Sequence, residues 1–331
     1  MAVARRLLSS AVLAAALAAV PIAVSAARVT PPPGAAARVQ PTFDVPAATR
    51  LLIIAPHPDD EVLSAAGLMQ RVHEGGGTIR VVYLTNGEGY PEGVRVEEHH
   101  QSPTTADYRD YGLRREREAR TSLNALNIGE YTMTFLSFPD GGLGKLMRRY
   151  WSERRAPYRS PYTRRNRPPA SKVLIQATEF RGEDLTLELA RIIGDFRPTM
   201  ILSPRKEDQH VDHCAAWYFT ADALSDVTRV DPEFSADLVT YIIHYYSWPF
   251  EDDGPRLGPP PHLRGGVSGW LSLPLTRAEA HAKSVAIKRY RTQMHVMAWF
   301  LDGFARSNEI FSRPSAPRLV LPDRRAVCDD P

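Results

Sequence analysis

The sequence predicts an α/β protein with a doubly wound, mostly parallel Rossmann-like sheet, helices on both faces, and loop insertions over the carboxyl ends of the strands. Two observations predict this fold. From residue 51 onwards, short apolar runs with strand character alternate with longer segments of helical apolar spacing. The chain of 331 residues is also 43% hydrophobic and 24% charged, which fits one large folded domain and excludes a disordered or fibrous protein.

The first 26 residues have the pattern of a secretory signal peptide. Arg5 and Arg6 precede an apolar run over residues 7–24, and Val24-Ser25-Ala26 offers the small residues of a cleavage site. A retained membrane anchor is the alternative, but the run is near the lower limit for a span and contains a proline. We therefore expect a secreted or extracytoplasmic protein with no stable membrane insertion after the signal is removed. The arginine pair leaves the export route open.

The charge of the chain is small. The formal net charge is +3, and residues 1–26 carry Arg5 and Arg6 but no acidic residue, so their removal leaves +1. A protein with so little net charge lacks the basic excess typical of nucleic-acid-binding domains. We therefore expect no nucleic-acid partner.

The elements of the fold follow a linker over residues 27–48, which is rich in Pro and Ala and has no hydrophobic period. The remaining domain, residues 49–331, contains the alternating pattern. Apolar runs predict strands, and spacings of three or four between apolar residues predict helices, with Gly75-Gly76-Gly77 and Pro198 as stop signals. The expected strands are 51–55, 79–84, 131–136, 199–203 and 239–246, and the expected helices are 62–73, 111–126, 184–196, 213–224 and 276–300.

Two insertions interrupt this alternation. Residues 90–110 have no clear period and are expected to form a loop or flap over the strand ends. Residues 145–170 mix arginines with aromatic residues, a composition that can grip an anionic polymer or stack on sugar rings. A solvated insertion is the simpler interpretation, because runs of charge usually face water.

The chain has two cysteines, Cys214 in an expected helix and Cys328 in the terminal tail. Two cysteines of an exported protein can pair. Nothing in the sequence brings these two together, so it favours two free thiols and leaves a disulfide open.

Two stretches rich in potential ligands follow predicted strands. Pro56-His57-Pro58-Asp59-Asp60-Glu61 comes directly after strand 51–55, and Asp208-Gln209-His210-Val211-Asp212-His213 comes shortly after strand 199–203. Doubly wound sheets bind ligands at the carboxyl ends of their strands, where the winding direction reverses. With ordinary winding, the two stretches face each other across that crevice.

Their side chains fit one divalent metal ion. His57, Asp60 and His213 would supply two imidazoles and one carboxylate, a set that suits Zn²⁺ and leaves a position open for water. Fe²⁺ is the alternative metal. Taken singly, a histidine is more often structural, and an aspartate at a helix start is often a cap. Capping alone does not explain two imidazoles at facing strand ends.

The neighbouring residues have the chemistry that a metal-dependent hydrolase needs. Zinc lowers the pKa of its bound water to about 7, and Asp59 is placed to take the proton of that water. His210 would stabilise an oxyanion or protonate a leaving amine. Asp212 would orient an imidazole.

These two motifs together resemble the PIG-L or LmbE-like family of zinc-dependent N-acetylglucosaminyl deacetylases. The resemblance covers most of the chain from Leu51 to Met294. Shorter supporting motifs lie between and after the two stretches: Thr85-Asn86-Gly87, Arg115-Glu116-Arg117-Glu118-Ala119, Phe138-Pro139-Asp140-Gly141, and the helix around Tyr290 to Gln293.

The resemblance implies the same roles for the residues of the two main motifs. It makes His57, Asp60 and His213 the metal ligands, Asp59 the general base, and His210 the group that assists at the oxyanion or the leaving group. It also implies that Arg115 and Asp140 contact sugar hydroxyls. The alternative for Arg115 is an ion pair with Glu118 or a neighbour on a solvated helix face.

The expected function is the removal of the N-acetyl group from an amino sugar by an exported enzyme that uses a zinc-bound water. Family members that act on small thiol precursors or lipid-linked sugars work in or facing the cytoplasm, whereas this chain carries an export signal. An N-acetylglucosamine-type glycan or glycoconjugate outside the cell is therefore the expected substrate. The alternatives are a metalloamidase that cleaves another acyl amide or a thiol conjugate, and a non-catalytic carbohydrate-binding protein.

Overall fold

The structure is a computed structural model that describes residues 40–250, 254–263, 269–314 and 323–328. The expected signal peptide and most of the expected linker lie outside the described residues. Residues 40–48, which we also expected in the linker, pack on the domain. The Phe43 amide donates to the Ser272 carbonyl, and the Phe43 side chain is buried against Phe311. The packed domain therefore begins before residue 49.

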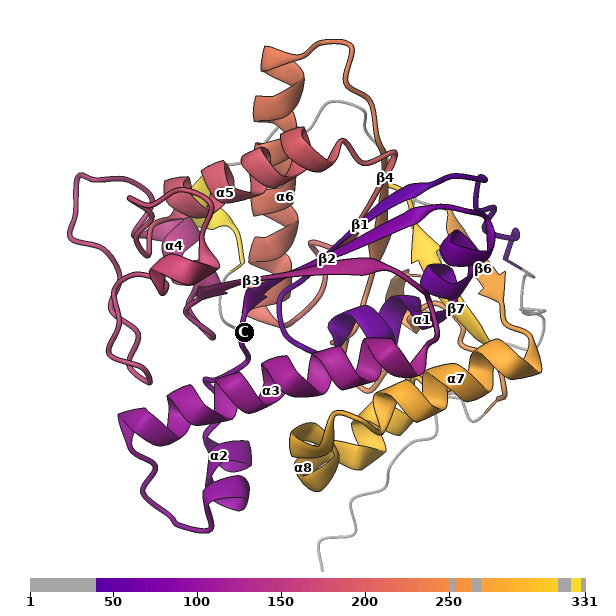
Figure 1. Ribbon diagram of the computed structural model, residues 1–331, viewed down its shortest axis with the longest axis horizontal. Helices are drawn as coiled ribbons and strands as arrows, with labels where there is room; N and C mark the ends of the chain where they lie inside the picture. Colours follow the sequence, from indigo (N-terminus) through magenta and orange to yellow (C-terminus); the bar gives the residue numbers. More distant parts are fainter. Residues whose placement is uncertain (1–39, 251–253, 264–268, 315–322, 329–331) are drawn as a thin grey trace, which may run out of the picture. The chain divides into compact units, whose positions relative to one another are not determined.

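The described residues form one seven-stranded sheet in the order β3-β2-β1-β4-β5-β7-β6 (Figure 1). The first five strands along the chain run parallel, and β7 is antiparallel to both of its neighbours. The strands are β1 Arg50–Ala55, β2 Thr78–Thr85, β3 Tyr131–Phe138, β4 Met200–Pro204, β5 Asp237–Tyr241, β6 Trp270–Pro274 and β7 Asn308–Ser312. This confirms the predicted mostly parallel α/β fold.

The described residues also form eight α-helices (Figure 1). They are α1 Asp60–Glu74, α2 Pro91–Glu98, α3 Thr105–Ala125, α4 Leu143–Arg148, α5 Gly182–Phe196, α6 Val211–Val230, α7 Arg277–Ile287 and α8 Arg291–Asp302. Among the helices that the structure describes, none is long and apolar enough to cross a membrane.

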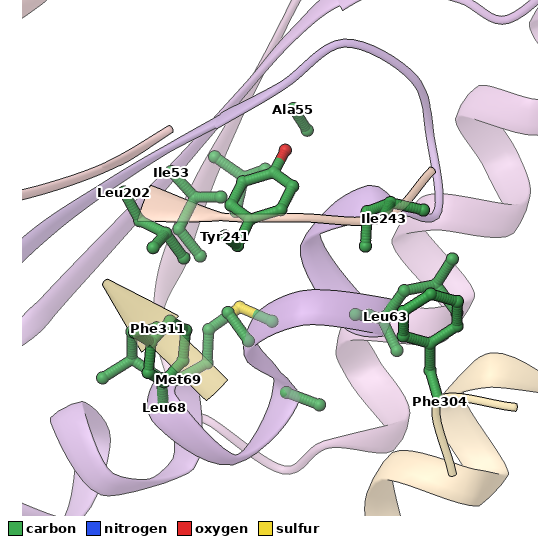
Figure 2. Packing of buried hydrophobic residues seen from close by; sticks show 14 of the residues in the cluster. Ile53, Ala55, Leu63, Leu68, Met69, Leu202, Tyr241, Ile243, Phe304 and Phe311 are labelled. Carbon is green, nitrogen blue, oxygen red and sulfur yellow. The ribbon is translucent and has the colours of Figure 1, made fainter. Parts of the chain in front are cut away.

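The core has two parts because successive side chains of a strand point to opposite faces of the sheet. Leu51 and Ile53 of β1 face a cluster that includes residues of α1, α3, α7 and α8. Leu52 and Ile54 face the other cluster, built with α4, α5 and α6. Figure 2 shows the first cluster, in which Leu68 and Met69 of α1 lie near Phe311 of β7. β1 is buried on both faces, which explains its uninterrupted apolar run.

Helix α1 is broken at Ala65, whose φ of −140° and ψ of 21° are not helical. A buried ion pair satisfies the backbone groups that this break frees. The Glu309 carboxylate of β7 accepts the amides of Gly67 (2.8 Å) and Leu68 (3.0 Å). Lys283 of α7 donates to the Leu63 carbonyl at 2.8 Å and to Glu309 at 2.9 Å. The pair thereby ties the first turns of α1, which follow the ligand-rich stretch, to α7 and β7.

The two cysteines form a disulfide, with their Cα atoms 5.6 Å apart. The expectation of two free thiols is therefore wrong. Packing of the C-terminal segment brings Cys328 to α6: Arg324 pairs with Asp222 of α6 and lies over the Trp151 ring at 3.8 Å. These contacts join residues far apart in sequence, and the local pattern around Cys328 does not indicate them.

Several element boundaries also differ from the prediction. Residues 90–110 contain α2 and the first turn of α3 rather than a loop, and Pro91 at the start of α2 was an available signal. The expected helix 276–300 is two helices, because the Glu118 carboxylate of α3 accepts the amide and hydroxyl of Thr292 and so fixes a new helix start. The antiparallel strands β6 and β7 and the short helix α4 were not predicted.

The aromatic residues of the arginine-rich insertion point inward. Tyr158 is buried and packs against Tyr150, and Trp151 stacks on Phe219 of α6. Tyr162 packs against Tyr108 of α3. These rings pack the insertion against the domain. This packing agrees with the simpler interpretation that the charged residues of the insertion face water.

Replacement of the buried Lys283 by Met is expected to destabilise the protein by about 3–5 kcal/mol, because it leaves the Glu309 carboxylate buried without its cation. Urea unfolding measures this change. The matched control is Arg191→Met, which removes an exposed ion pair with Asp195 and should cost less than about 1 kcal/mol. Equal costs for the two changes would contradict the role given to the Lys283–Glu309 pair.

Replacement of Cys328 by Ser is expected to lower the free energy of unfolding by about 2–4 kcal/mol, since the disulfide closes a loop with a sequence separation of 114. Urea unfolding of the oxidised wild type and the variant measures the difference. Reduced wild-type protein should then unfold like the variant. An oxidised wild type no more stable than its reduced form would rule out this contribution.

Candidate active site

The stretch after β1 makes a strained turn into α1. Asp59, the residue before the helix, has a φ of 132° and a ψ of −31°, a conformation that costs a non-glycine residue about 1–3 kcal/mol. Its carbonyl accepts the amides of Val62 and Leu63, so the backbone begins the helix. Its side chain makes no capping hydrogen bond and points to other partners. The turn therefore places the Asp59 side chain in the site, where it does not cap α1.

Three donor atoms from the two motifs form a nearly equilateral triangle. His57 Nδ1 lies 3.4 Å from Asp60 Oδ2, Asp60 Oδ2 lies 3.3 Å from His213 Nε2, and the two imidazole nitrogens lie 3.2 Å apart. Ligands bound at about 2.0–2.1 Å in a tetrahedral zinc site lie about 3.3–3.4 Å from one another. The donor set and its spacing therefore fit a tetrahedral metal ion with one further position.

The His213 ring is held by Asp208. Asp208 Oδ2 lies 3.1 Å from His213 Nδ1 and also accepts the amides of Ile243 at 2.9 Å and His244 at 3.1 Å. A carboxylate on one nitrogen of an imidazole turns the other nitrogen toward a metal. Burial opposes the shift, but Asp208 and Asp60 raise the pKa of His213 to about 9. Asp208 stands in the second ligand-rich motif, but no role was predicted for it.

The His57 ring faces a second pair of carboxylates with its other nitrogen. His57 Nε2 lies 3.1 Å from Asp140 Oδ1 and 3.6 Å from Asp212 Oδ2. Burial opposes the shift, but Asp140 is the main group that raises the pKa of His57 well above its usual value. The raised pKa values of both imidazoles show that the surrounding carboxylates favour positive charge at the triangle.

Asp140 and Asp212 are also fixed by backbone amides. Asp140 Oδ2 accepts the Gly89 amide at 2.6 Å. The Asp212 carboxylate, which is fully buried, accepts the amides of Gly141 at 2.7 Å and Leu143 at 2.9 Å. The expected role of Asp212 was to orient an imidazole. Orientation of an imidazole by Asp212 stays a prediction, and the structure shows that Asp212 holds the loop that carries Asp140.

Arg115 of α3 contacts the Asp59 carboxylate and is only 4% exposed. Its guanidinium donates to Asp59 Oδ2 at 3.1 Å, to the Pro58 carbonyl at 2.6 Å and to the Gly87 carbonyl at 2.9 Å. Gly87 has a φ of +63°, and a Cβ there would lie 1.9 Å from the guanidinium, so only glycine permits this approach. Burial raises the pKa of Asp59 to about 7, although Arg115 opposes the shift.

The arrangement of Arg115 excludes the ion pair with Glu118, whose carboxylate binds Thr292 instead. The structure places Arg115 and Asp140 beside the triangle. Contact of either residue with a sugar hydroxyl stays a prediction.

His210 is the capping residue before α6, and its ring lies beside the triangle. Its Nδ1 accepts the Asp212 amide at 3.2 Å, and its ring centre lies 4.7 Å from that of His57. Burial, together with His57 and His213, lowers the pKa of His210 to about 4. His210 is therefore a neutral imidazole at neutral pH, with Nδ1 as an acceptor and Nε2 left to carry the proton.

His244, which follows β5, also lies at the site and was not predicted. Its ring centre lies 4.9 Å from that of His213 and 5.2 Å from that of His210, and the ring stacks on Phe300 of α8. Its donor atom also groups with those of Asp60 and His213. The predicted strand 239–246 was too long, so it placed His244 inside the strand. The shorter β5 puts His244 at the edge where the other site residues lie.

Comparison with known proteins gives a family for this chain. The family model described as PIG-L: GlcNAc-PI de-N-acetylase matches residues 52–224, more than half of the chain. This range contains both ligand-rich motifs and every strand end that contributes to the triangle. Comparison with curated protein sequences gave no match.

Solved structures resemble this chain at low sequence identity. A deacetylase from teicoplanin biosynthesis, solved in complex with teicoplanin, is 19% identical, with a TM-score of 0.50 over 80% of this chain and 97% of that one. The N,N'-diacetylchitobiose deacetylase of Pyrococcus horikoshii is 16% identical, with a TM-score of 0.48 over 81% and 85%. GalB, the 4-carboxy-2-hydroxymuconate hydratase of Pseudomonas putida KT2440, is 14% identical, with a TM-score of 0.49 over 83% and 99%. Because one fold hosts different reactions, these likenesses concern architecture alone. On the family match, the chain belongs to the PIG-L family.

Proposed function

We propose that this protein is an exported, metal-dependent deacetylase that removes the N-acetyl group from an N-acetylglucosamine-type amino sugar in a glycan or glycoconjugate. The observation that carries the proposal is the triangle of His57 Nδ1, Asp60 Oδ2 and His213 Nε2 with the Asp59 carboxylate next to it. Membership of a family described by a de-N-acetylase supports amide hydrolysis of an amino sugar.

The proposed metal is zinc, held by His57, Asp60 and His213; ferrous iron suits the same two-histidine, one-carboxylate set. A zinc ion there would supply a Lewis acid for the acetyl carbonyl and lower the pKa of a water molecule to about 7. The buried carboxylates around the two imidazoles support a cation at this point, because isolated buried negative charge is costly.

The protein residues have separate roles in this proposal. Asp59 takes a proton from the attacking water and passes it to the leaving amine. Arg115 fixes the Asp59 carboxylate through its hydrogen bond to Oδ2. His210, neutral and with Nε2–H as donor, stabilises the negative charge that develops on the acetyl oxygen.

Export is supported by two separate observations. The first 26 residues have the pattern of a secretory signal, and Cys214 and Cys328 are joined by a disulfide. Structural disulfides persist in oxidising compartments and are rare in the cytosol. A substrate outside the cytoplasm follows from this placement.

Replacement of Asp59 by Asn is expected to lower kcat for acetate release by about 10²–10⁴-fold, since the group that accepts the proton is removed while its shape is kept. Zinc content, measured by elemental analysis, should stay at the wild-type level because Asp59 is not one of the three proposed ligands. Acetate release is measured over N-acetylglucosamine, its oligomers and other acyl amides. The matched control, Asp195→Asn on the exposed face of α5, should retain wild-type turnover.

Two results would contradict the proposal. One is a zinc-loaded wild-type protein that releases acetate from no amino sugar. Release of a different acid from another acyl amide would then favour the related metalloamidase. The other is an Asp59→Asn variant with wild-type turnover, which would remove Asp59 from the reaction.

A further inference from the structure

Glu61 is a fully buried acid to which the proposed reaction gives no role. It is the third carboxylate of the first motif and lies in the first turn of α1. An acid so deeply buried needs partners for both of its oxygens. The structure supplies one partner for each oxygen, and these two partners indicate the role of Glu61.

The first partner is the backbone of Asp59. The Asp59 amide donates to Glu61 Oε2 at 3.1 Å. Amides at the start of a helix have no partner within the helix, and this one belongs to the residue with a φ of 132°. The Glu61 carboxylate therefore closes the strained turn by binding the amide of the strained residue itself.

The second partner fixes Glu61 from outside α1. The Tyr290 hydroxyl donates to Glu61 Oε1, and Tyr290 is itself fully buried. Tyr290 lies between α7 and α8, where its amide donates to the Ile287 carbonyl. The chain Tyr290–Glu61–Asp59 thus connects the junction of the last two helices with the turn of the active site.

From this geometry we infer that Glu61 is a positioning residue that holds the backbone of Asp59 in its strained conformation, with Tyr290 as its anchor. The inference rests on the proposed function, because it takes Asp59 to be the general base. With φ positive, the Asp59 side chain meets Arg115 and lies beside the triangle. If the turn relaxed, Asp59 would adopt the ordinary capping conformation, with its side chain turned to the helix amides.

The test compares Glu61→Leu with Glu61→Gln. Leu has a similar size but no acceptor for the Asp59 amide, whereas Gln keeps an acceptor for that amide and a polar group for the Tyr290 hydroxyl. Hydrogen exchange is measured on a peptide covering residues 55–61. Pro56 and Pro58 have no amide, so few exchanging positions compete with Asp59. The Asp59 amide should exchange faster in the Leu variant and stay protected in the Gln variant.

Kinetics give the second readout. Glu61→Leu should lower kcat about 10- to 100-fold with little change in KM and with zinc retained, because a small misplacement of the base affects the chemical step. Glu61→Gln should restore most of kcat. Tyr290→Phe should lower kcat by a smaller factor, and its control is Tyr111→Phe, which removes a buried tyrosine hydroxyl bonded to Gln293 instead.

The control for general destabilisation is Glu188→Leu. Glu188 is also fully buried and accepts backbone amides, those of Leu174 and Ile175, but it lies on α5 away from the triangle. This variant should unfold more easily yet keep the wild-type kcat while folded. A similar fall in kcat for Glu188→Leu and Glu61→Leu would mean that Glu61 only stabilises the fold and does not position Asp59.

An unchanged exchange rate at Asp59 in folded Glu61→Leu protein would overturn the inference. The exchange measurement does not depend on the reaction. If the wild-type protein releases acetate from no substrate but exchange accelerates only in the Leu variant, the proposed function fails and the positioning by Glu61 stands. If the wild type is active and exchange is unchanged, the positioning fails alone.

Discussion

The parallel pairing of β1 with β4 is the constraint on which the site depends. Leu51, Leu52 and Ile53 pair with Met200, Ile201 and Leu202, although about 150 residues separate the two strands. The chain winds outward from β1 through β2 and β3, then returns to place β4 on the other side of β1. Ligands bind at such reversals because the loops after the two strands diverge and leave a crevice. His57 and Asp60 reach this crevice after β1, and His213 reaches it after β4.

The second requirement is compensation of buried charge. Asp60, Asp140, Asp208 and Asp212 all lie within the domain, and an uncompensated carboxylate there would be costly. Backbone amides offset much of this cost, since Asp208, Asp140 and Asp212 each accept at least one. Arg115 supplies a positive charge beside Asp59. The donor atoms of the triangle converge among these carboxylates, which is the point at which a divalent cation is proposed.

The fold and the two ligand-rich motifs were readable from the sequence because they depend on local patterns. Strand β1 has four apolar residues in succession, and the motif after it combines residue types that metals bind. The contact of Asp208 with His213 could not be predicted, because the sequence does not distinguish a carboxylate that orients an imidazole from any other acidic residue. The role of Glu61 depends on Tyr290, 229 residues away, and no local pattern indicates that contact.

The features that were predicted wrongly depend on contacts between distant segments. The break between α7 and α8 is fixed by Glu118 of α3, and the disulfide depends on the packing of the C-terminal segment on α6. Strands β6 and β7 have only five residues each and pair across two intervening helices. Helix α2 is the exception, because it has a local signal, Pro91 at its first position. The prediction of a loop gave more weight to the absence of an apolar period.

The most direct test of this account is the position of the metal. In crystals of the zinc-loaded protein, anomalous diffraction at the zinc absorption edge locates the ion independently of any substrate. We expect one strong peak about 2.0–2.1 Å from His57 Nδ1, Asp60 Oδ2 and His213 Nε2, with Asp59 too far away to bind the metal. A peak on the other side of the ring, between His57 Nε2, Asp140 and Asp212, or no peak at the triangle, would contradict it.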